Sequence, residues 1–219
     1  MKHTIKEVAE SLIGRTLGVN DGIDKVQIEQ AEIRLGLKLP EVLREFYALV
    51  GNLDIFTSSF ESFAPLEEME CENDMLIFLY ENQGGCCWGL NLHEVTHSTV
   101  YMCTDTEAEK PEWYPEEITL DKFLKIIMYL QCAEGGYEYG CAVYEHDFEG
   151  RKEYEEFLSG ITVGWEKVVD YNGFVSYQKD TKLIWYFSDN EGKMEDILYA
   201  SAYTEDNMEE LLSIGFSEL

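Results

Sequence analysis

Two helix patterns joined by a Leu-Pro step, between Asp24 and Asn52, constrain the fold of this chain more than any other stretch. Asp24 stands at an N-cap position, and Gln27 three residues later completes a capping-box pattern. Gly36 follows the first pattern at a C′ position, and Pro40 opens the second, where its fixed φ and missing N–H do no harm. Apolar residues recur on one face of each pattern: Ile28, Ala31 and Leu35 in the first, and Val42, Leu43, Phe46, Tyr47 and Val50 in the second. We therefore expect two consecutive amphipathic helices that bury these faces in a core.

The rest of the chain mixes helix and strand patterns. Amphipathic helix patterns occupy 3–17, 120–130, 151–158 and 205–214, and runs of strand length occupy 75–80, 86–92, 98–103, 136–144, 168–171, 174–178, 183–188 and 197–203. No repeat and no Pro/Gly/Ser-rich linker divides the 219 residues. The sequence therefore predicts an α+β fold, with N-terminal, middle and C-terminal helices packed against a mainly antiparallel β-sheet in one domain over 1–219. A division near residue 133 is the alternative.

The chain is strongly acidic. It carries 44 Asp and Glu against 16 Lys and Arg, which gives a formal net charge of −28. Such a surface repels nucleic acid and anionic membranes, and it attracts basic proteins and speeds the encounter with them. We therefore expect a basic protein partner, with no direct binding to nucleic acid or membrane. The alternative is that the charge serves solubility alone.

One long segment lacks basic residues altogether. Between Arg44 and Lys110 there is no Lys or Arg, whereas 13 Asp and Glu occur. If the strands at 75–80 and 98–103 are neighbours, the acidic loops beside them would form one negative surface. With the aromatic residues that follow, the candidate partner-binding residues are Glu67, Glu68, Glu70, Glu72, Asp74, Glu107, Glu109, Trp113 and Tyr114. The alternative is a set of solvated acidic loops.

Nothing in the sequence resembles a secretory signal or a membrane span. Residues 1–18 lack the uninterrupted apolar stretch of a signal peptide, and no run approaches the ~20 apolar residues of a membrane helix. The six cysteines are then expected to be reduced, buried thiols. The sequence predicts a cytoplasmic protein.

One sequence motif matches the pattern of a catalytic zinc site. His93 to His97 reads H-E-x-x-H, which on a helix places two histidines on one face for zinc and a glutamate as base. The surrounding Val, Thr and Tyr residues favour strand, and in an extended chain the two histidines would lie roughly 13 Å apart. We therefore expect no catalytic residues, no metal site and no cofactor.

Three stretches resemble one known family. The run Ile-Glu-x-Ala-Glu-x-x-Leu-Gly-x-x-Leu-Pro from Ile28 to Pro40 resembles the opening of the SMI1/KNR4 proteins, also called the SUKH superfamily. Further matches are Glu81-Asn82-Gln83-Gly84 followed by Trp88-Gly89-Leu90, and Trp113 followed by Leu120, Phe123 and Leu124. The resemblance covers 24–130, and we expect 133–219 to supply C-terminal strands and a helix of the same domain.

The resemblance implies a binding protein rather than an enzyme. Many bacterial members of the superfamily resemble immunity proteins of polymorphic or contact-dependent toxin systems, which bind a cognate toxin domain in the cytoplasm of the producing cell. The expected partner is a basic toxin domain of nuclease or deaminase type. The alternative implied by eukaryotic members is an intracellular scaffold or regulatory adaptor without a toxin partner.

Overall fold

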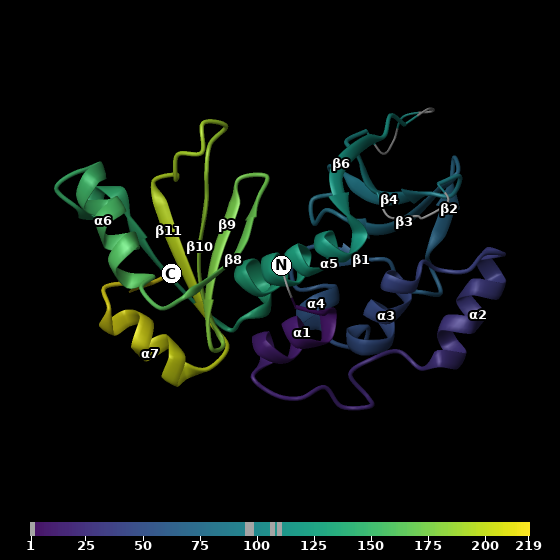
Figure 1. Ribbon diagram of the computed structural model, residues 1–219, viewed down its shortest axis with the longest axis horizontal. Helices are drawn as coiled ribbons and strands as arrows, with labels where there is room; N and C mark the ends of the chain where they lie inside the picture. Colours follow the sequence, from purple (N-terminus) through teal and green to yellow (C-terminus); the bar gives the residue numbers. More distant parts are fainter. Residues whose placement is uncertain (1–2, 95–98, 106–107, 109–110) are drawn as a thin grey trace. The chain divides into compact units, whose positions relative to one another are not determined.

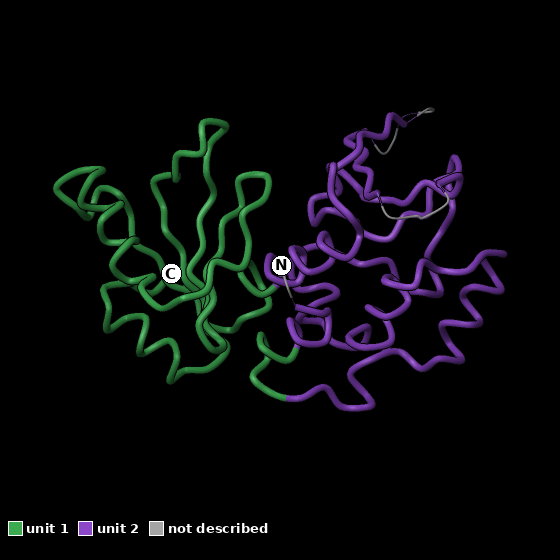
Figure 2. Tube along the Cα trace, viewed as in Figure 1, with its two compact units in different colours: residues 1–2, 10–15, 132–219 green, residues 3–9, 16–131 purple. Residues whose placement is uncertain are grey.

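The chain divides into two compact units in the computed structural model, which describes residues 3–94, 99–105, 108 and 111–219. The N-terminal unit comprises residues 3–9 and 16–131, and the C-terminal unit comprises 10–15 and 132–219 (Figure 2). The boundary after Gln131 lies beside the division near 133 that the sequence left open. Folding of 1–219 as one cooperative domain stays a prediction.

Helices of the N-terminal unit lie on one side of its sheet (Figure 1). They are the first part of α1 (Ile5–Ile13), α2 (Lys25–Leu35), α3 (Glu41–Val50), the single turn α4 (Asp54–Thr57) and α5 (Leu120–Gln131). The antiparallel strands are β1 (Ser62–Phe63), β2 (Glu70–Glu72), β3 (Met75–Tyr80), β4 (Cys87–Asn91), β5 (Thr99–Cys103) and β6 (Tyr114–Thr119). Their order is β1-β3-β4-β5-β6, and β2 lies beside the first half of β3 at the same edge as β1.

The expected helix pair is confirmed as α2 and α3. The Asp24 carboxylate accepts the N–H of Val26 at 2.7 Å, and Gly36 takes a left-handed φ of 70° after α2. In α2, Ile28 and Ala31 are buried and Leu35 is partly buried, whereas α3 buries Leu43, Phe46, Tyr47 and Val50. Periodic apolar spacing therefore identified the buried faces correctly.

Aromatic rings join these helices to the sheet. The ring of Phe46 on α3 stacks on Phe63 of β1 with centroids 4.5 Å apart. The ring of Phe78 on β3 meets Phe123 of α5 edge to face at 6.0 Å. These contacts place the main core between the helices and one face of the sheet.

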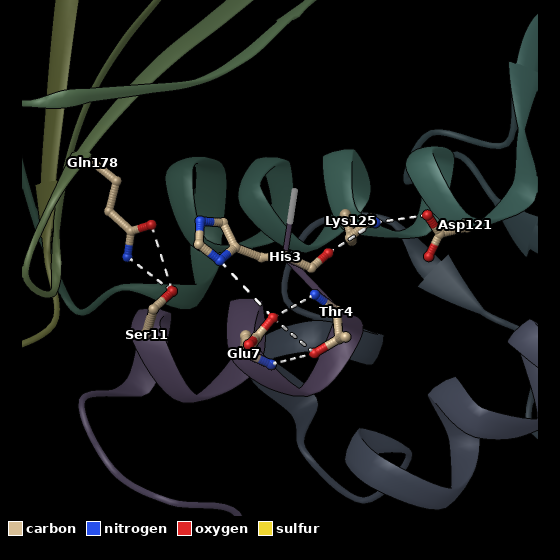
Figure 3. Close-up of polar contacts among 7 residues, drawn as sticks. All are labelled: His3, Thr4, Glu7, Ser11, Asp121, Lys125 and Gln178. Carbon is tan, nitrogen blue, oxygen red and sulfur yellow. Dashed lines mark hydrogen bonds and ion pairs between the residues drawn. The ribbon is translucent and has the colours of Figure 1, made fainter. Parts of the chain in front are cut away.

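Polar contacts hold the start of α1 in the N-terminal unit (Figure 3). The Thr4 N–H donates to Glu7 at 2.8 Å, and the Glu7 N–H donates to the Thr4 hydroxyl at 3.2 Å, so the two residues cap the helix reciprocally. The buried Lys125 ammonium donates to the His3 carbonyl at 3.0 Å and to Asp121 at 2.6 Å. The same lysine thus anchors the segment that precedes α1.

The C-terminal unit has its own antiparallel sheet and core. Its elements are η1 (Cys132–Gly136), β7 (Tyr139–Tyr144), η2 (Glu145–Asp147), α6 (Arg151–Ile161), β8 (Glu166–Tyr171), β9 (Phe174–Lys179), β10 (Lys182–Phe187), β11 (Ile197–Ala202), α7 (Glu205–Ser213) and β12 (Ser217–Glu218). The strand order is β12-β7-β11-β10-β9-β8. Side chains of α6 and α7, such as Tyr154 and Leu211, pack with Ile184 and Leu198 of the sheet in one buried cluster.

The α+β class is confirmed, with the strands divided between two antiparallel sheets. The sequence missed β6, which directly precedes the helix expected at 120–130, and the short strands β1 and β2. Among the described residues, none of the helices combines the length and the apolar character that crossing a bilayer requires.

Candidate functional site

The face of the N-terminal sheet that points away from its helices carries no helix among the described residues (Figure 1). We call it the helix-free face. Directly paired residues on neighbouring strands project to the same side of a sheet. The register pairs Ile77, Gly89 and Tyr101 across β3, β4 and β5, and it pairs Tyr80, Cys87 and Cys103 in the same way. Both rows lie on the helix-free face, where Ile77, Cys87 and Cys103 form a small buried cluster.

The indole of Trp113 covers this cluster. A Cβ at Gly89 would lie 3.1 Å from Cζ3 of Trp113 and 3.2 Å from the carbonyl oxygen of Leu76. Glycine at position 89 therefore lets the indole rest directly on the backbone of β4. The indole Nε1 is buried, and no described residue accepts its proton.

Two of the predicted acidic residues share the helix-free face with Trp113. Glu70 pairs with Ile77 and Glu72 pairs with Met75, so both exposed side chains project to that side of the edge strand β2. Burial raises the pKa of the Tyr80 phenol, and the Cys87 thiol and the carboxylates of Glu70 and Glu72 raise it further. The face is therefore electrically negative as well as aromatic.

Two more of the predicted acidic residues, Glu67 and Glu68, lie in a different part of the N-terminal unit. Glu67 and Glu68 are exposed in a turn that Arg34 holds by donating to the carbonyls of Leu66 at 2.8 Å and Met69 at 2.7 Å. Glu67 also lines a cavity of about 590 Å³ between α2 and the segment after α4. Glu67 therefore belongs to the helix side of the unit, and Glu68 is exposed in the same turn.

Two further predicted positions, Asp74 and Tyr114, are described at other points of the unit. Asp74 lies in the turn between β2 and β3, where its carboxylate is 3.1 Å from Nε2 of His93. Tyr114 pairs with Met102 and projects to the opposite face from Trp113, with its hydroxyl donating to Glu112 at 2.6 Å. Glu107 and Glu109 lie outside the described residues.

The sequence predicted one negative surface on the condition that the strands at 75–80 and 98–103 are neighbours. These strands, β3 and β5, are not neighbours in the sheet. Strand β4 lies between β3 and β5, which puts these two strands about 10 Å apart. The chain also leaves β5 at the end of the sheet where Tyr80 lies, whereas Asp74 precedes β3 at the other end. Asp74 and the end of β5 therefore lie at opposite ends of the sheet.

A comparison with protein families identifies the fold of this unit. The model of the SMI1/KNR4 family (SUKH-1) matches residues 22–126. Residues 22–126 are an SMI1/KNR4 domain. The match contains α2 to α4, the whole N-terminal sheet and the first half of α5, and it leaves the C-terminal unit outside. No curated protein and no solved structure matches the chain significantly.

The SMI1/KNR4 domain brings to the helix-free face three residues that were not among the predicted partner-binding residues. They are Tyr80, which is 38% exposed, Tyr101, and Glu94, which accepts a hydrogen bond from the Tyr101 hydroxyl. Strict alternation from the buried end of β5 would have placed Tyr101 there. Strict alternation along β3 would not have placed Tyr80 on this face, because the irregular register between Ile77 and Leu79 shifts the alternation by one residue.

The described residues of the H-E-x-x-H motif are not helical. His93 and Glu94 lie in a turn after β4, while His97 lies outside the described residues. Glu94 is engaged by Tyr101, and His93 pairs with Asp74. Within the described ranges, no three His, Cys, Asp or Glu side chains are grouped so that they would hold a metal ion.

The cysteines are free thiols, but they are not all buried. Cys71 is exposed on β2 and Cys86 is partly exposed, so the expectation of six buried thiols was wrong for these two. Cys87 and Cys103 face each other on β4 and β5 beneath Trp113. Burial raises the pKa of the Cys87 thiol most, and the neighbouring Cys103 thiol is the next cause, so that the pKa is about 12. The Cys87 thiol therefore stays protonated and unreactive.

Proposed function

We propose that this chain is a non-enzymatic immunity protein that binds a cognate toxin domain and neutralises it. The observation that carries the proposal is the SMI1/KNR4 domain at residues 22–126. Bacterial proteins that resemble this family protect the cell that makes the toxin, and they do so by direct protein–protein binding. The chain would act in the cytoplasm, where the toxin is synthesised or delivered.

The charge of the chain supports a basic toxin as the partner. The net charge is −28, and no Lys or Arg occurs between Arg44 and Lys110. A toxin domain that acts on nucleic acid, such as a nuclease or a deaminase, needs a positive groove for its substrate. An acidic protein competes for that groove, and association would be fast at low salt and slower at high salt.

Binding to the product of an adjacent toxin-like gene tests this proposal. The full chain and the toxin domain, inactivated at its own catalytic residue, are purified separately and mixed on a size-exclusion column. A stoichiometric complex that blocks the active toxin in vitro supports the proposal. Separate elution at low salt, or a complex that leaves the toxin fully active, contradicts neutralisation by binding.

A second candidate function is an intracellular adaptor without a toxin partner. The observation that favours it is the C-terminal unit, which has its own core and lies outside the family match. An adaptor would use this unit to hold a second protein. The gene neighbourhood and the viability of a deletion strain separate the two functions, because only an immunity protein is essential when its toxin is produced.

A further inference from the structure

We propose that the partner docks on the helix-free face of the SMI1/KNR4 domain through an arginine-bearing segment, which lies over Trp113 and pairs with Glu70 and Glu72. This inference rests on the proposed function, because it assumes a basic protein partner. The sequence suggested acidic positions in several loops as the binding surface. We place that surface on one face of the N-terminal sheet. This surface excludes Glu67 and Glu68, which lie in the turn that Arg34 of α2 holds and not on β2.

The positions of the two carboxylates suit a cation that arrives from solvent. Glu70 and Glu72 alternate with Cys71 on β2, so their side chains emerge about 7 Å apart on the same face. Strand β2 lies at the edge of the sheet, next to β3 only, and all three of its residues are exposed. An incoming segment therefore reaches these side chains without displacing any described element.

The charge on this face is not compensated within the described structure. No Lys, Arg or His side chain forms an ion pair with Glu70 or Glu72 there, whereas Glu32 has both Lys38 and Arg44 within 4 Å. Burial and the Cys87 thiol raise the pKa of the Tyr80 phenol most, and the carboxylates of Glu70 and Glu72 raise it further. A cationic partner is the complement to such a face.

The aromatic side chains favour arginine over lysine as the cation. Tyr80 is 38% exposed, and the partly buried Trp113 indole lies over Gly89, two strands or about 10 Å from β2. A guanidinium stacks on aromatic rings, binds carboxylates with two parallel hydrogen bonds and loses hydration more readily than an ammonium. A segment with two arginines spans the distance between the rings and the carboxylates.

Hexa-arginine is the probe that tests the docking face. The 15N-labelled full chain is titrated with hexa-arginine in buffer of about 0.15 M ionic strength, where long-range attraction is screened. We expect saturable shifts of the backbone amides of Glu70, Glu72 and Tyr80 and of the Trp113 indole N–H. Hexa-lysine should bind the same site severalfold more weakly.

Matched charge-removing variants make the test specific. Glu70→Gln/Glu72→Gln and Glu67→Gln/Glu68→Gln remove the same charge from exposed positions that are close in sequence. The first pair lies on β2, and the second lies in the turn held by Arg34. The first pair should weaken hexa-arginine binding at Trp113 by about fivefold, and the second by less than twofold. Equal losses in the two pairs, or no shift at Trp113, would overturn the proposal.

Cell protection separates this inference from the proposed function. If Glu70→Gln/Glu72→Gln protects against the toxin as well as the wild type does, neutralisation stands and the docking face is wrong. If hexa-arginine docks at Trp113 but a strain without this chain grows normally beside an expressed toxin, the face stands as a cation-binding surface and the immunity function is wrong.

Discussion

The backbone N–H of Leu39 donates to the buried carboxylate of Glu32 at 3.2 Å. The same carboxylate accepts a hydrogen bond from Lys38 at 2.6 Å and lies 3.4 Å from Nε of Arg44 on α3. One glutamate therefore joins the end of α2 to the Leu-Pro step and to the following helix. Glu32, the second glutamate of the run from Ile28 to Pro40, is thus a structural link of the SMI1/KNR4 domain.

The stability of the chain should depend on the ionisation of Glu32. Desolvation acts to raise its pKa, but the hydrogen bonds from Lys38 and Leu39 and the charges of Lys38 and Arg44 outweigh it, so the pKa lies below its ordinary value of 4.5. A folded pKa below the unfolded one stabilises the protein above the unfolded value, and this contribution is lost as the pH falls through the folded pKa. Glu32→Gln should cost about 1 kcal/mol at pH 7 and progressively less below pH 4.5, measured by urea unfolding. A cost independent of pH would contradict this role of the charge.

Gln131 should be more important for stability than its position at the end of α5 suggests. Its fully buried amide accepts the N–H groups of Phe60 at 2.6 Å and Glu61 at 2.9 Å, and it donates to the carbonyl of Glu61 at 2.7 Å. Gln131→Leu leaves these groups without that partner and should destabilise the fold by at least about 2 kcal/mol. The exposed Gln30 on α2 provides the control, since Gln30→Leu should change stability by no more than about 0.5 kcal/mol. Similar unfolding midpoints for the two variants would show that the network is dispensable.

Gly89→Ala should displace the Trp113 indole. The added Cβ would lie 3.1 Å from the indole and 3.2 Å from a backbone carbonyl, and the backbone has little freedom to move away. We expect a loss of about 1–3 kcal/mol and a change in the chemical shift of the Trp113 indole N–H. Gly160→Ala is the control, because no atom lies within 4 Å of its added Cβ. An unchanged indole signal in Gly89→Ala would mean that Trp113 does not rest on β4.

Two tryptophans of the same domain should respond differently to replacement by phenylalanine. Trp88 donates from Nε1 to Glu116 at 2.9 Å, whereas the buried Nε1 of Trp113 has no acceptor among the described residues. Trp88→Phe therefore removes a hydrogen bond in addition to packing contacts, and Trp113→Phe removes packing contacts together with a donor that is costly to bury. Trp88→Phe should be the more destabilising by about 1 kcal/mol in urea unfolding. The opposite order would indicate an acceptor for Trp113 that the described residues do not contain.

Local patterns predicted the elements of this fold well where periodicity and caps act together. The helix pair α2 and α3, the strand β3 and the meander β8 to β10 lie where apolar spacing and turn residues placed them. Strands β2 and β6 were missed because they are mostly exposed and rich in glutamate, and their strand geometry depends on pairing with β3 and β5. Pairing with a neighbouring strand is not visible in a strand's own residues.

The sequence predicted the residue types of the candidate site, which are acidic and aromatic, but not which of these residues share a face. Glu67 and Glu68 are close in sequence to Glu70 and Glu72, yet they lie in the turn held by Arg34, and Glu67 lines the cavity beside α2. Trp113 and Tyr114 are adjacent in sequence and project to opposite faces. A shift of one residue in register reverses the face of every side chain, so the binding face required the strand pairing itself.

The most direct test of the account is the viability of a strain that lacks this chain but expresses the adjacent toxin gene. Colony counts are compared for an empty plasmid, the wild-type chain, Glu70→Gln/Glu72→Gln, and the matched pair Glu67→Gln/Glu68→Gln. We expect no viable colonies with the empty plasmid, restored growth with the wild type and the matched pair, and poor growth with Glu70→Gln/Glu72→Gln. Normal growth with the empty plasmid, while the toxin is expressed and active, would contradict the claim that this protein confers immunity.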